Sequence, residues 1–264
     1  MRTLISVVAI VAGLTPAPAS AAPLPEGSAD HTAGSQILKH EGAGGLRTAE
    51  DSPPTAGKVP GMDVSSHQGD VDWRSAWDKG ARFTYVKATE GTGYRNPKFT
   101  QQYDGSHDVG MIRGAYHFAL PDRAGGAAQA NFFVDNGGGW SPDGKTLPPA
   151  LDMEYNPYGE TCFGMSQAAM TGWVKEFSDT VFARTRRYPM IYTSTSWWNR
   201  CVGGSVKFGD DNPLWVARYS SEVGPLPVGF DFHTIWQWQA DGYFPGDQNL
   251  FNGTFDQLQR IAAS

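Results

Sequence analysis

From residue 61 onward, short apolar runs alternate with helical patterns, and this alternation constrains the fold more than any other feature. The strand-like segments are 61–65, 83–89, 112–119, 147–154, 189–193, 214–219, 233–239 and a short last piece near Asp247. Helical patterns occupy 72–79, 97–109, 127–135 and 166–187, and each stops at or just before a Gly or Pro. Strands that alternate with helices form a mostly parallel sheet. We therefore predict an α/β fold, a single-domain β/α barrel like the TIM barrel with about eight strands over residues 61–264; a doubly wound open sheet is the alternative.

The first 60 residues differ from the rest in composition. Residues 1–21 begin with a basic residue, continue through an apolar run over 4–14 and reach Ala19-Ser20-Ala21, which is typical of a secretory signal peptide. Residues 22–60 contain mainly Ala, Gly, Pro and Ser with almost no large apolar side chains, so we expect a disordered linker or a pro-segment there. No other stretch approaches the ~20 apolar residues that span a bilayer. We expect a soluble, secreted, extracellular protein with no membrane partner.

Charge and missing motifs narrow the classes of function. The net charge is −6 with no run of Lys or Arg, which argues against nucleic acid as a partner. The sequence has no Gly-rich dinucleotide or phosphate-binding motif, and no Gly-x-Ser-x-Gly around a serine nucleophile. Its six histidines lack the spacing of zinc ligands. We expect no metal and no cofactor.

An acid pair ends the segment 147–154. Side chains alternate along a strand, so Asp152 and Glu154 share one face. Two carboxyls held close together among apolar neighbours acquire different pKa values, so one keeps its proton while the other is ionised. This division suits hydrolysis of a glycosidic bond. Asp70 and Asp72 have the same spacing, but they stand in a polar stretch where we expect a loop and a helix cap.

Other predicted strands also end in polar or aromatic residues. In a β/α barrel the active site lies at the carboxyl ends of the strands, where acids and aromatic rings would line a carbohydrate cleft. We expect two more acids in the cleft: Asp63 at the end of the first strand and Asp247 near the last strand. The candidate substrate contacts are Lys87, Tyr116, Phe118, Tyr192, Trp236, Trp238 and Asn249.

Several of these side chains have a structural alternative. Tyr116 and Phe118 are equally compatible with a place in the core. Trp236 and Trp238 share one face of their segment, and we expect one of them to serve packing. His117 alternates away from Tyr116 and is expected to be a core histidine with its hydrogen bonds satisfied.

The two cysteines, Cys162 and Cys201, are expected to form a disulfide, because an isolated pair in a secreted protein usually does so. Two buried thiols are the alternative.

Five sequence blocks in a fixed order carry a family resemblance. They are Gly61-Met62-Asp63-Val64-Ser65, Tyr85-Val86-Lys87-Ala88-Thr89-Glu90-Gly91, Gly114-Ala115-Tyr116-His117-Phe118, Leu151-Asp152-Met153-Glu154-Tyr155-Asn156-Pro157 and Ile235-Trp236-Gln237-Trp238. Together they resemble glycoside hydrolase family 25, the muramidases of the Chalaropsis type, from about residue 61 to the C-terminus. The resemblance implies a modified β/α barrel with fewer helices than strands. It also implies hydrolysis of the β-1,4 bond between N-acetylmuramic acid and N-acetylglucosamine in peptidoglycan. We expect the protein to be a monomer.

The resemblance also implies roles for single residues. Glu154 matches the general acid of the family and Asp152 its partner carboxylate, while Asp63 matches the acid of the first strand. Asp247, rather than Asp256, fits the pattern of the fourth acid, since Asn249 and an Asn-Gly pair follow it at the family's spacing.

Lys87 and Tyr116 match pocket residues that contact the sugar. Matching cysteines occur in a subgroup for which the resemblance implies activity on O-acetylated muramic acid.

Two other functions are possible alternatives for such a barrel. A chitinase-like glycosidase would need acids at 147 and 150, where Leu147 and Ala150 stand. A non-catalytic cell-wall-binding barrel would not need four intact acids. Retaining, inverting and substrate-assisted chemistry all remain open, and the last, with Asp152 orienting the acetamide of the sugar, is preferred.

Overall fold

The computed structural model describes residues 30–43 and 57–263. The predicted signal peptide, residues 1–21, lies outside the described residues, as does part of the stretch 22–60. No helix among the described residues is long and apolar enough to cross a membrane.

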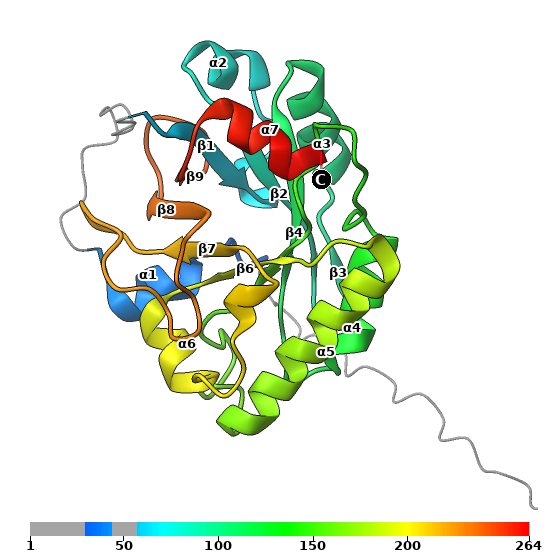
Figure 1. The fold of residues 1–264 in the computed structure, drawn as a ribbon. Coiled ribbons are helices and arrows are strands. Elements are labelled where there is room, and N and C mark those ends of the chain that lie inside the picture. The colour runs from blue at the N-terminus through cyan, green and yellow to red at the C-terminus, as the bar shows by residue number, and fades with distance from the viewer. Residues whose placement is uncertain (1–29, 44–56, 264) are drawn as a thin grey trace, which may run out of the picture.

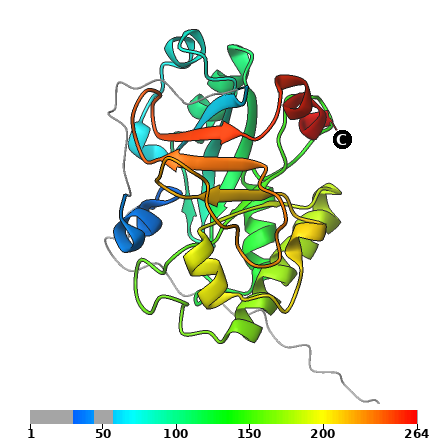
Figure 2. The ribbon, with the colours of Figure 1, turned by 60° about the vertical axis from the view of Figure 1, so that its left-hand side comes forward.

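Eight strands form a closed ring, in the order β1-β9-β8-β7-β6-β5-β4-β2, and a pairing between β1 and β2 closes it (Figures 1 and 2). The strands of the ring are β1 (Val59–Val64), β2 (Phe83–Glu90), β4 (Ile112–Phe118), β5 (Ala150–Asp152), β6 (Met190–Thr193), β7 (Leu214–Ala217), β8 (Ile235–Gln239) and β9 (Asp247–Phe251). All neighbours pair in parallel except β9, which runs antiparallel to β1 and β8. A short β3 (Tyr94–Arg95) pairs antiparallel with β2 outside the ring. The predicted barrel is confirmed, and the open sheet is excluded.

Helices pack against the outside and one end of the ring (Figure 1). They are α1 (Ser35–Glu41), α2 (Trp73–Asp78), α3 (Phe99–Asp108), α4 (Gly126–Asp135), α5 (Gln167–Thr185), α6 (Thr195–Cys201) and α7 (Phe255–Ala263), with 3₁₀ turns at Ser66–Gln68 and Phe208–Asp210. The helices α2 to α5 lie where the sequence predicts them. As expected, Asp72 caps α2 by accepting a hydrogen bond from the Ser75 backbone.

The barrel interior is filled by large aromatic side chains. Tyr85 on β2 stacks on Trp215 of β7 with 4.8 Å between ring centroids, and Tyr192 meets the same indole edge-on at 4.7 Å. Gly114 makes room for this layer, because a Cβ there would lie 2.3 Å from the Tyr85 ring. The interior below the carboxyl ends of the strands is therefore a packed core.

The strand β5 is shorter than predicted. Its ladder covers Ala150–Asp152 rather than the whole of 147–154, since Pro148 and Pro149 have no N–H to donate to a neighbouring strand. Glu154 therefore stands two residues beyond the end of the strand.

The N-terminal stretch also differs from the expectation of a disordered linker over residues 30–43. Here α1 packs on the barrel, with Ala33 and Ile37 fully buried in the main hydrophobic core. Seven residues are too few for a stable isolated helix, so contacts with the barrel must hold it. The sequence gives one indication of this packing, because Ile37 and Leu38 are large apolar residues in a stretch that is otherwise small and polar.

Cys162 and Cys201 form the predicted disulfide, which ties the loop after β5 to the last residue of α6. It closes a loop with a sequence separation of 39 residues.

Replacing both cysteines by serine should lower the free energy of unfolding by about 3 kcal/mol, or the melting temperature by roughly 6–12 °C, because the unfolded chain regains loop entropy. Differential scanning calorimetry measures the effect. A reducing agent should destabilise the wild type alone, and equal melting of wild type and double variant would contradict the prediction.

Candidate active site

Four carboxyl side chains meet at one end of the barrel. Asp63 lies near the carboxyl end of β1, Asp152 ends β5, and Glu154 follows two residues later. Asp247 is the first residue of β9, and because this strand is antiparallel its amino end lies at the same rim, with Asp247 in register with Asp63. The four side chains are between 0 and 7% exposed. The structure therefore brings together all four acids that the sequence predicts for the site.

Gln237 bridges two of these acids. Its Nε2 lies 2.9 Å from Asp63 Oδ2 and 3.1 Å from Asp247 Oδ2. Its Oε1 accepts hydrogen bonds from the hydroxyls of Tyr192 at 2.7 Å and Tyr219 at 2.8 Å. Neither Gln237 nor Tyr219 is among the site residues that the sequence predicts, although both stand near the ends of predicted strands. Alternation along β8 indicates Gln237, because it stands between Trp236 and Trp238 and therefore points to the opposite face of the strand.

Asn249 provides a second amide to the same acid. Its Nδ2 donates to Asp63 Oδ2 at 2.6 Å, while its Oδ1 accepts from Trp215 Nε1 at 2.8 Å. The indole in the barrel core thus orients the amide, and the amide orients the carboxyl of Asp63.

Burial raises the pKa of every acid in the cluster. It raises the pKa of Asp63 to about 7, against the hydrogen bonds from Gln237 and Asn249. It raises the pKa of Glu154 to about 8, although three backbone N–H groups favour the ionised form.

Burial also raises the pKa of Asp152 well above its usual range, and the negative charge of Glu154 raises it further. The pKa of Asp247 is raised in the same way, first by burial and then by the negative charge of Asp63. Neither carboxyl oxygen of Asp152 has a hydrogen-bond partner among the described residues. The cluster therefore retains protons at neutral pH.

Residues 33–37 cover Glu154. The backbone N–H of Gly34 donates to Glu154 Oε1 at 2.8 Å, and those of Gln36 and Ile37 donate to Oε2 at 2.8 and 2.9 Å. Both oxygens of the carboxyl are thus bound by the start of α1.

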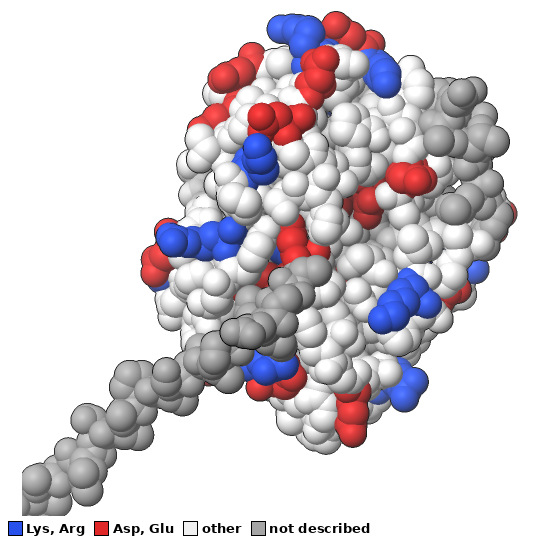
Figure 3. All heavy atoms as spheres, turned by 180° about the vertical axis from the view of Figure 1, so that it is seen from behind, with Lys and Arg blue, Asp and Glu red and all other residues white. Residues whose placement is uncertain are grey.

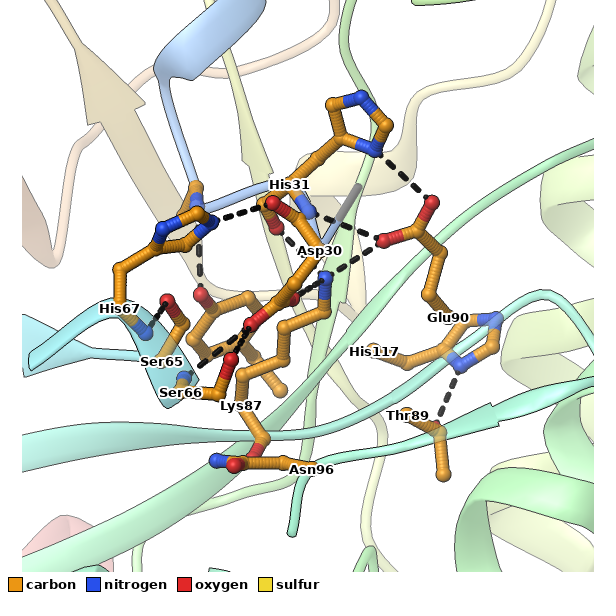
Figure 4. A network of polar contacts seen from close by, with 12 residues as sticks. Asp30, His31, Ser65, Ser66, His67, Lys87, Thr89, Glu90, Asn96 and His117 are labelled. Carbon is orange, nitrogen blue, oxygen red and sulfur yellow. Dashed lines mark hydrogen bonds and ion pairs between the residues drawn. The ribbon is translucent and has the colours of Figure 1, made fainter. Parts of the chain in front are cut away.

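Lys87 lies beside the acids in a network of ion pairs (Figure 4). Its ammonium is fully buried, 2.6 Å from Glu90 Oε2 and 2.6 Å from the carbonyl oxygen of His31, and it also pairs with Asp30. Burial acts to raise the pKa of Glu90 and of Asp30, but the positive charge of Lys87 and the hydrogen bonds to each carboxyl together outweigh it and lower both pKa values.

Sequence reasoning did not choose Glu90, because alternation places residues three apart on opposite faces of a strand. The register of β2 against β4 shifts between Lys87 and Thr89, and this bulge turns Lys87 and Glu90 toward one another.

Some of the predicted substrate contacts lie near the acids. The hydroxyl of Tyr116 accepts a hydrogen bond from the Ala33 backbone at 3.2 Å. Phe118 lies under the Lys87 ammonium, 5.2 Å from its ring centroid, and its ring is 5.4 Å from that of His31.

The tryptophans lie differently. Trp236 is placed on the face of β8 opposite Gln237, where its indole donates to the Arg218 carbonyl at 2.9 Å. Trp238 lies at a register shift between β8 and β9 and is buried.

His117 is the core histidine that the sequence predicts. It is fully buried between Thr89 Oγ1 at 2.7 Å and Gln129 Oε1 at 2.9 Å, and burial lowers its pKa to about 4. Among the described residues, no group of three or more His, Cys, Asp or Glu side chains is arranged to hold a metal ion.

A cleft of about 530 Å³ lies beside α1. Barrel residues and residues of the N-terminal stretch both line it: Ile37, Glu41, Tyr155, Thr195, Arg218 and Tyr219.

Comparisons with known proteins agree with this geometry. Residues 62–247 match the family described as Glycosyl hydrolases family 25. The chain is 48% identical over 209 residues to an N,O-diacetylmuramidase from Chalaropsis sp, a match that covers 77% of this chain and 99% of that one. It is 42% identical to Lysozyme M1 of Streptomyces globisporus over 87% of this chain and 79% of that one. Its structure is similar to that of a muramidase from Acremonium alcalophilum, with a TM-score of 0.76 and 50% identity over 78% of this chain and 99% of that one.

The fold, the acid-rich rim and these matches lead to one conclusion: the chain is a glycoside hydrolase and belongs to glycosyl hydrolases family 25.

Proposed function

We propose that this protein is a lysozyme of the N-acetylmuramidase type, which hydrolyses the β-1,4 bond between N-acetylmuramic acid and N-acetylglucosamine in bacterial peptidoglycan. One observation carries the proposal: four buried acids with raised pKa values share one rim of the barrel. Relatives that match most of the chain are named as muramidases or lysozymes, which supports the choice of substrate.

Glu154 is the proposed general acid. A carboxyl that protonates the leaving oxygen must hold its proton at the working pH, and burial raises the pKa of Glu154 to about 8. Asp152 is the proposed partner carboxylate. Asp63 and Asp247 would set the charge of the site, and Gln237 and Asn249 fix the position of Asp63.

The proposed contacts with the sugar divide into two groups. Lys87, Tyr116 and Phe118 present their side chains to the space now filled by residues 30–34. Tyr192 and Asn249 hold Gln237 and Asp63 and so position the acids. Trp236 and Trp238 stay candidates for the outer edge of the cleft or for packing.

We also propose that the protein is secreted and acts as a monomer on cell walls. The disulfide supports an oxidising compartment. On the face shown in Figure 3, the described Lys and Arg side chains are scattered singly among Asp and Glu, which does not resemble the continuous basic surface that binds nucleic acid.

Replacing Glu154 by Gln should slow the clearing of purified peptidoglycan roughly 10²–10⁴-fold, because the leaving oxygen loses its proton donor. The loss of turbidity is followed with the full chain and with a chain that begins at Gly57. Glu176→Gln, an exposed position on α5, is the matched control and should clear as the wild type does. Equal clearing by Glu154→Gln and wild type would end the assignment. Binding without clearing in either length of wild type would indicate a non-catalytic wall-binding barrel.

Replacing Asp152 by Asn should also abolish most turnover, and yet no covalent sugar–enzyme adduct should accumulate. In the substrate-assisted route, the acetamide oxygen of the sugar is the nucleophile and Asp152 only orients and stabilises this group. Intact-protein mass spectrometry during turnover tests this. A glycosyl adduct on the enzyme would exclude the route.

The protonation of Glu154 can be tested through stability. Its folded pKa, about 8, is raised above the ordinary value of 4.5, so its contribution to stability is present at low pH and is lost as pH rises through about 8. The free energy of unfolding should therefore fall between pH 5 and 8, by up to about 1.4 kcal/mol per pH unit for each such group. Glu154→Gln should make this fall less steep. Parallel urea-unfolding profiles of the two proteins over this range would contradict the raised pKa.

A further inference from the structure

We propose that residues 30–42 are an intramolecular plug that occupies the acid cluster and keeps the full chain in a latent form. The inference rests on the proposed function, since latency presupposes an activity at this cluster. The segment that occupies the acid cluster belongs to the chain itself, and it contacts groups of the proposed site and of its rim.

The plug removes Glu154 from reach of a substrate. A general acid must come within about 2.6–3.2 Å of the oxygen that it protonates. Here both carboxyl oxygens are already bound, at 2.8 to 2.9 Å, by the backbone N–H groups of Gly34, Gln36 and Ile37. A glycosidic oxygen cannot approach Glu154 until α1 moves away.

The plug also fills the floor of the site with its own amide groups. The Ala33 N–H donates to Tyr116, and the Ala33 carbonyl oxygen lies 3.2 Å from Gln237 Nε2. The Gly34 carbonyl oxygen lies 3.1 Å from the Tyr219 hydroxyl and shares the single proton of that hydroxyl with Gln237 Oε1. The plug therefore fills the space through which a polar ligand would approach Tyr116, Gln237 and Tyr219.

Gly34 permits this close approach. Its φ is +87°, and a Cβ at this position would lie 1.8 Å from the Tyr219 hydroxyl and 2.6 Å from Gln237 Oε1. Both atoms belong to the fully packed floor, so no other residue fits here without displacing the segment.

At the start of the plug, Asp30 and His31 complete the ion-pair network of Lys87 (Figure 4). Asp30 pairs with Lys87 and accepts from the Ser66 backbone at 3.1 Å. His31 Nδ1 lies 2.9 Å from Glu90 Oε1, and the His31 backbone N–H donates to Glu90 Oε2 at 3.2 Å. The plug thus provides a carboxylate to a buried ammonium that the substrate would otherwise face.

The other end of the plug is anchored by packing. Ile37 is 1% exposed within the main core. His40 stacks on Tyr155 with 4.3 Å between ring centroids, and Glu41 accepts hydrogen bonds from Tyr155 at 3.0 Å and from Ser194. Contacts therefore run along the whole segment from Asp30 to Glu41, rather than at a single point.

A segment tethered to the same chain competes with substrate at a high effective concentration. The apparent affinity for substrate is then reduced by the fraction of molecules in which the site is open. The match with the Chalaropsis relative covers 99% of that protein but only 77% of this chain. The barrel, from Val59 onward, makes up a similar share of this chain, 206 of 264 residues. A chain of barrel length is therefore a reasonable uninhibited reference.

The test compares two glycines of the plug. Gly34→Ala places a Cβ against the floor, whereas a Cβ at Gly42, which also has a positive φ of +72°, meets no atom within 4 Å. Both substitutions place an alanine at a positive φ and so strain the backbone, but only Gly34→Ala also drives a Cβ into the floor, and only it should unseat the plug. Ile37→Asp, paired with the exposed Lys39→Asp, provides an independent second comparison.

Two readouts are taken on each full-length variant: clearing of purified peptidoglycan, and hydrogen exchange of the backbone amides of residues 34, 36 and 37. We expect Gly34→Ala and Ile37→Asp to clear at least about tenfold faster than the wild type and to approach the chain that begins at Gly57. Their amides should exchange rapidly, while Gly42→Ala and Lys39→Asp should behave as the wild type does.

Two results would contradict different parts of this proposal: the latency of the full chain, or the proposed function itself. If the wild type clears as fast as Gly34→Ala and the shortened chain, the plug does not hold the enzyme latent. If no protein clears, including the shortened chain, but exchange rises only in Gly34→Ala and Ile37→Asp, the proposed function fails while the seating of the plug is upheld.

Discussion

The structure depends on one electrostatic constraint, the packing of four carboxyl groups together at a rim that is closed off from water. Removing an ionised carboxylate from water is unfavourable unless the charge is paired. In this cluster the cost is reduced because the carboxyls keep protons and accept hydrogen bonds from N–H groups that point at them. Gln237 and Asn249 donate to Asp63, and three backbone N–H groups donate to Glu154. A nearby ammonium, Lys87, is neutralised by Asp30 and Glu90.

The closed barrel imposes this proximity. Parallel strands carry their carboxyl ends to one rim, and the antiparallel β9 adds Asp247 to it from its amino end. Below the acids, Tyr85 and Tyr192 pack on Trp215, so no space is left there into which the carboxyl groups could move. The rigid layer underneath and the hydrogen-bonded amides above it keep the carboxyls at fixed positions, as a site for acid catalysis requires.

The sequence predicts most of this arrangement, because strand periodicity and acids at strand ends are local signals. These signals predict Asp63, Asp152 and Glu154, and the family pattern near the C-terminus selects Asp247. What the sequence missed depends on relations between strands: the antiparallel direction of β9, and the bulge that turns Glu90 toward Lys87. The contact between Tyr219 and Gln237 follows only from the pairing of β7 with β8. The helix α1 is weak as a local signal, since it is stabilised by the carboxyl of Glu154 from 117 to 120 residues away.

The central claim is that the buried cluster holds its protons at neutral pH while α1 covers it. The most direct measurement is a pH titration of ¹³C-labelled carboxyl groups by NMR in the full chain, with Glu154→Gln used to assign the signal. The account predicts that Glu154 titrates near pH 8, because burial outweighs the three backbone hydrogen bonds. A signal that titrates near the ordinary 4.5 would contradict it.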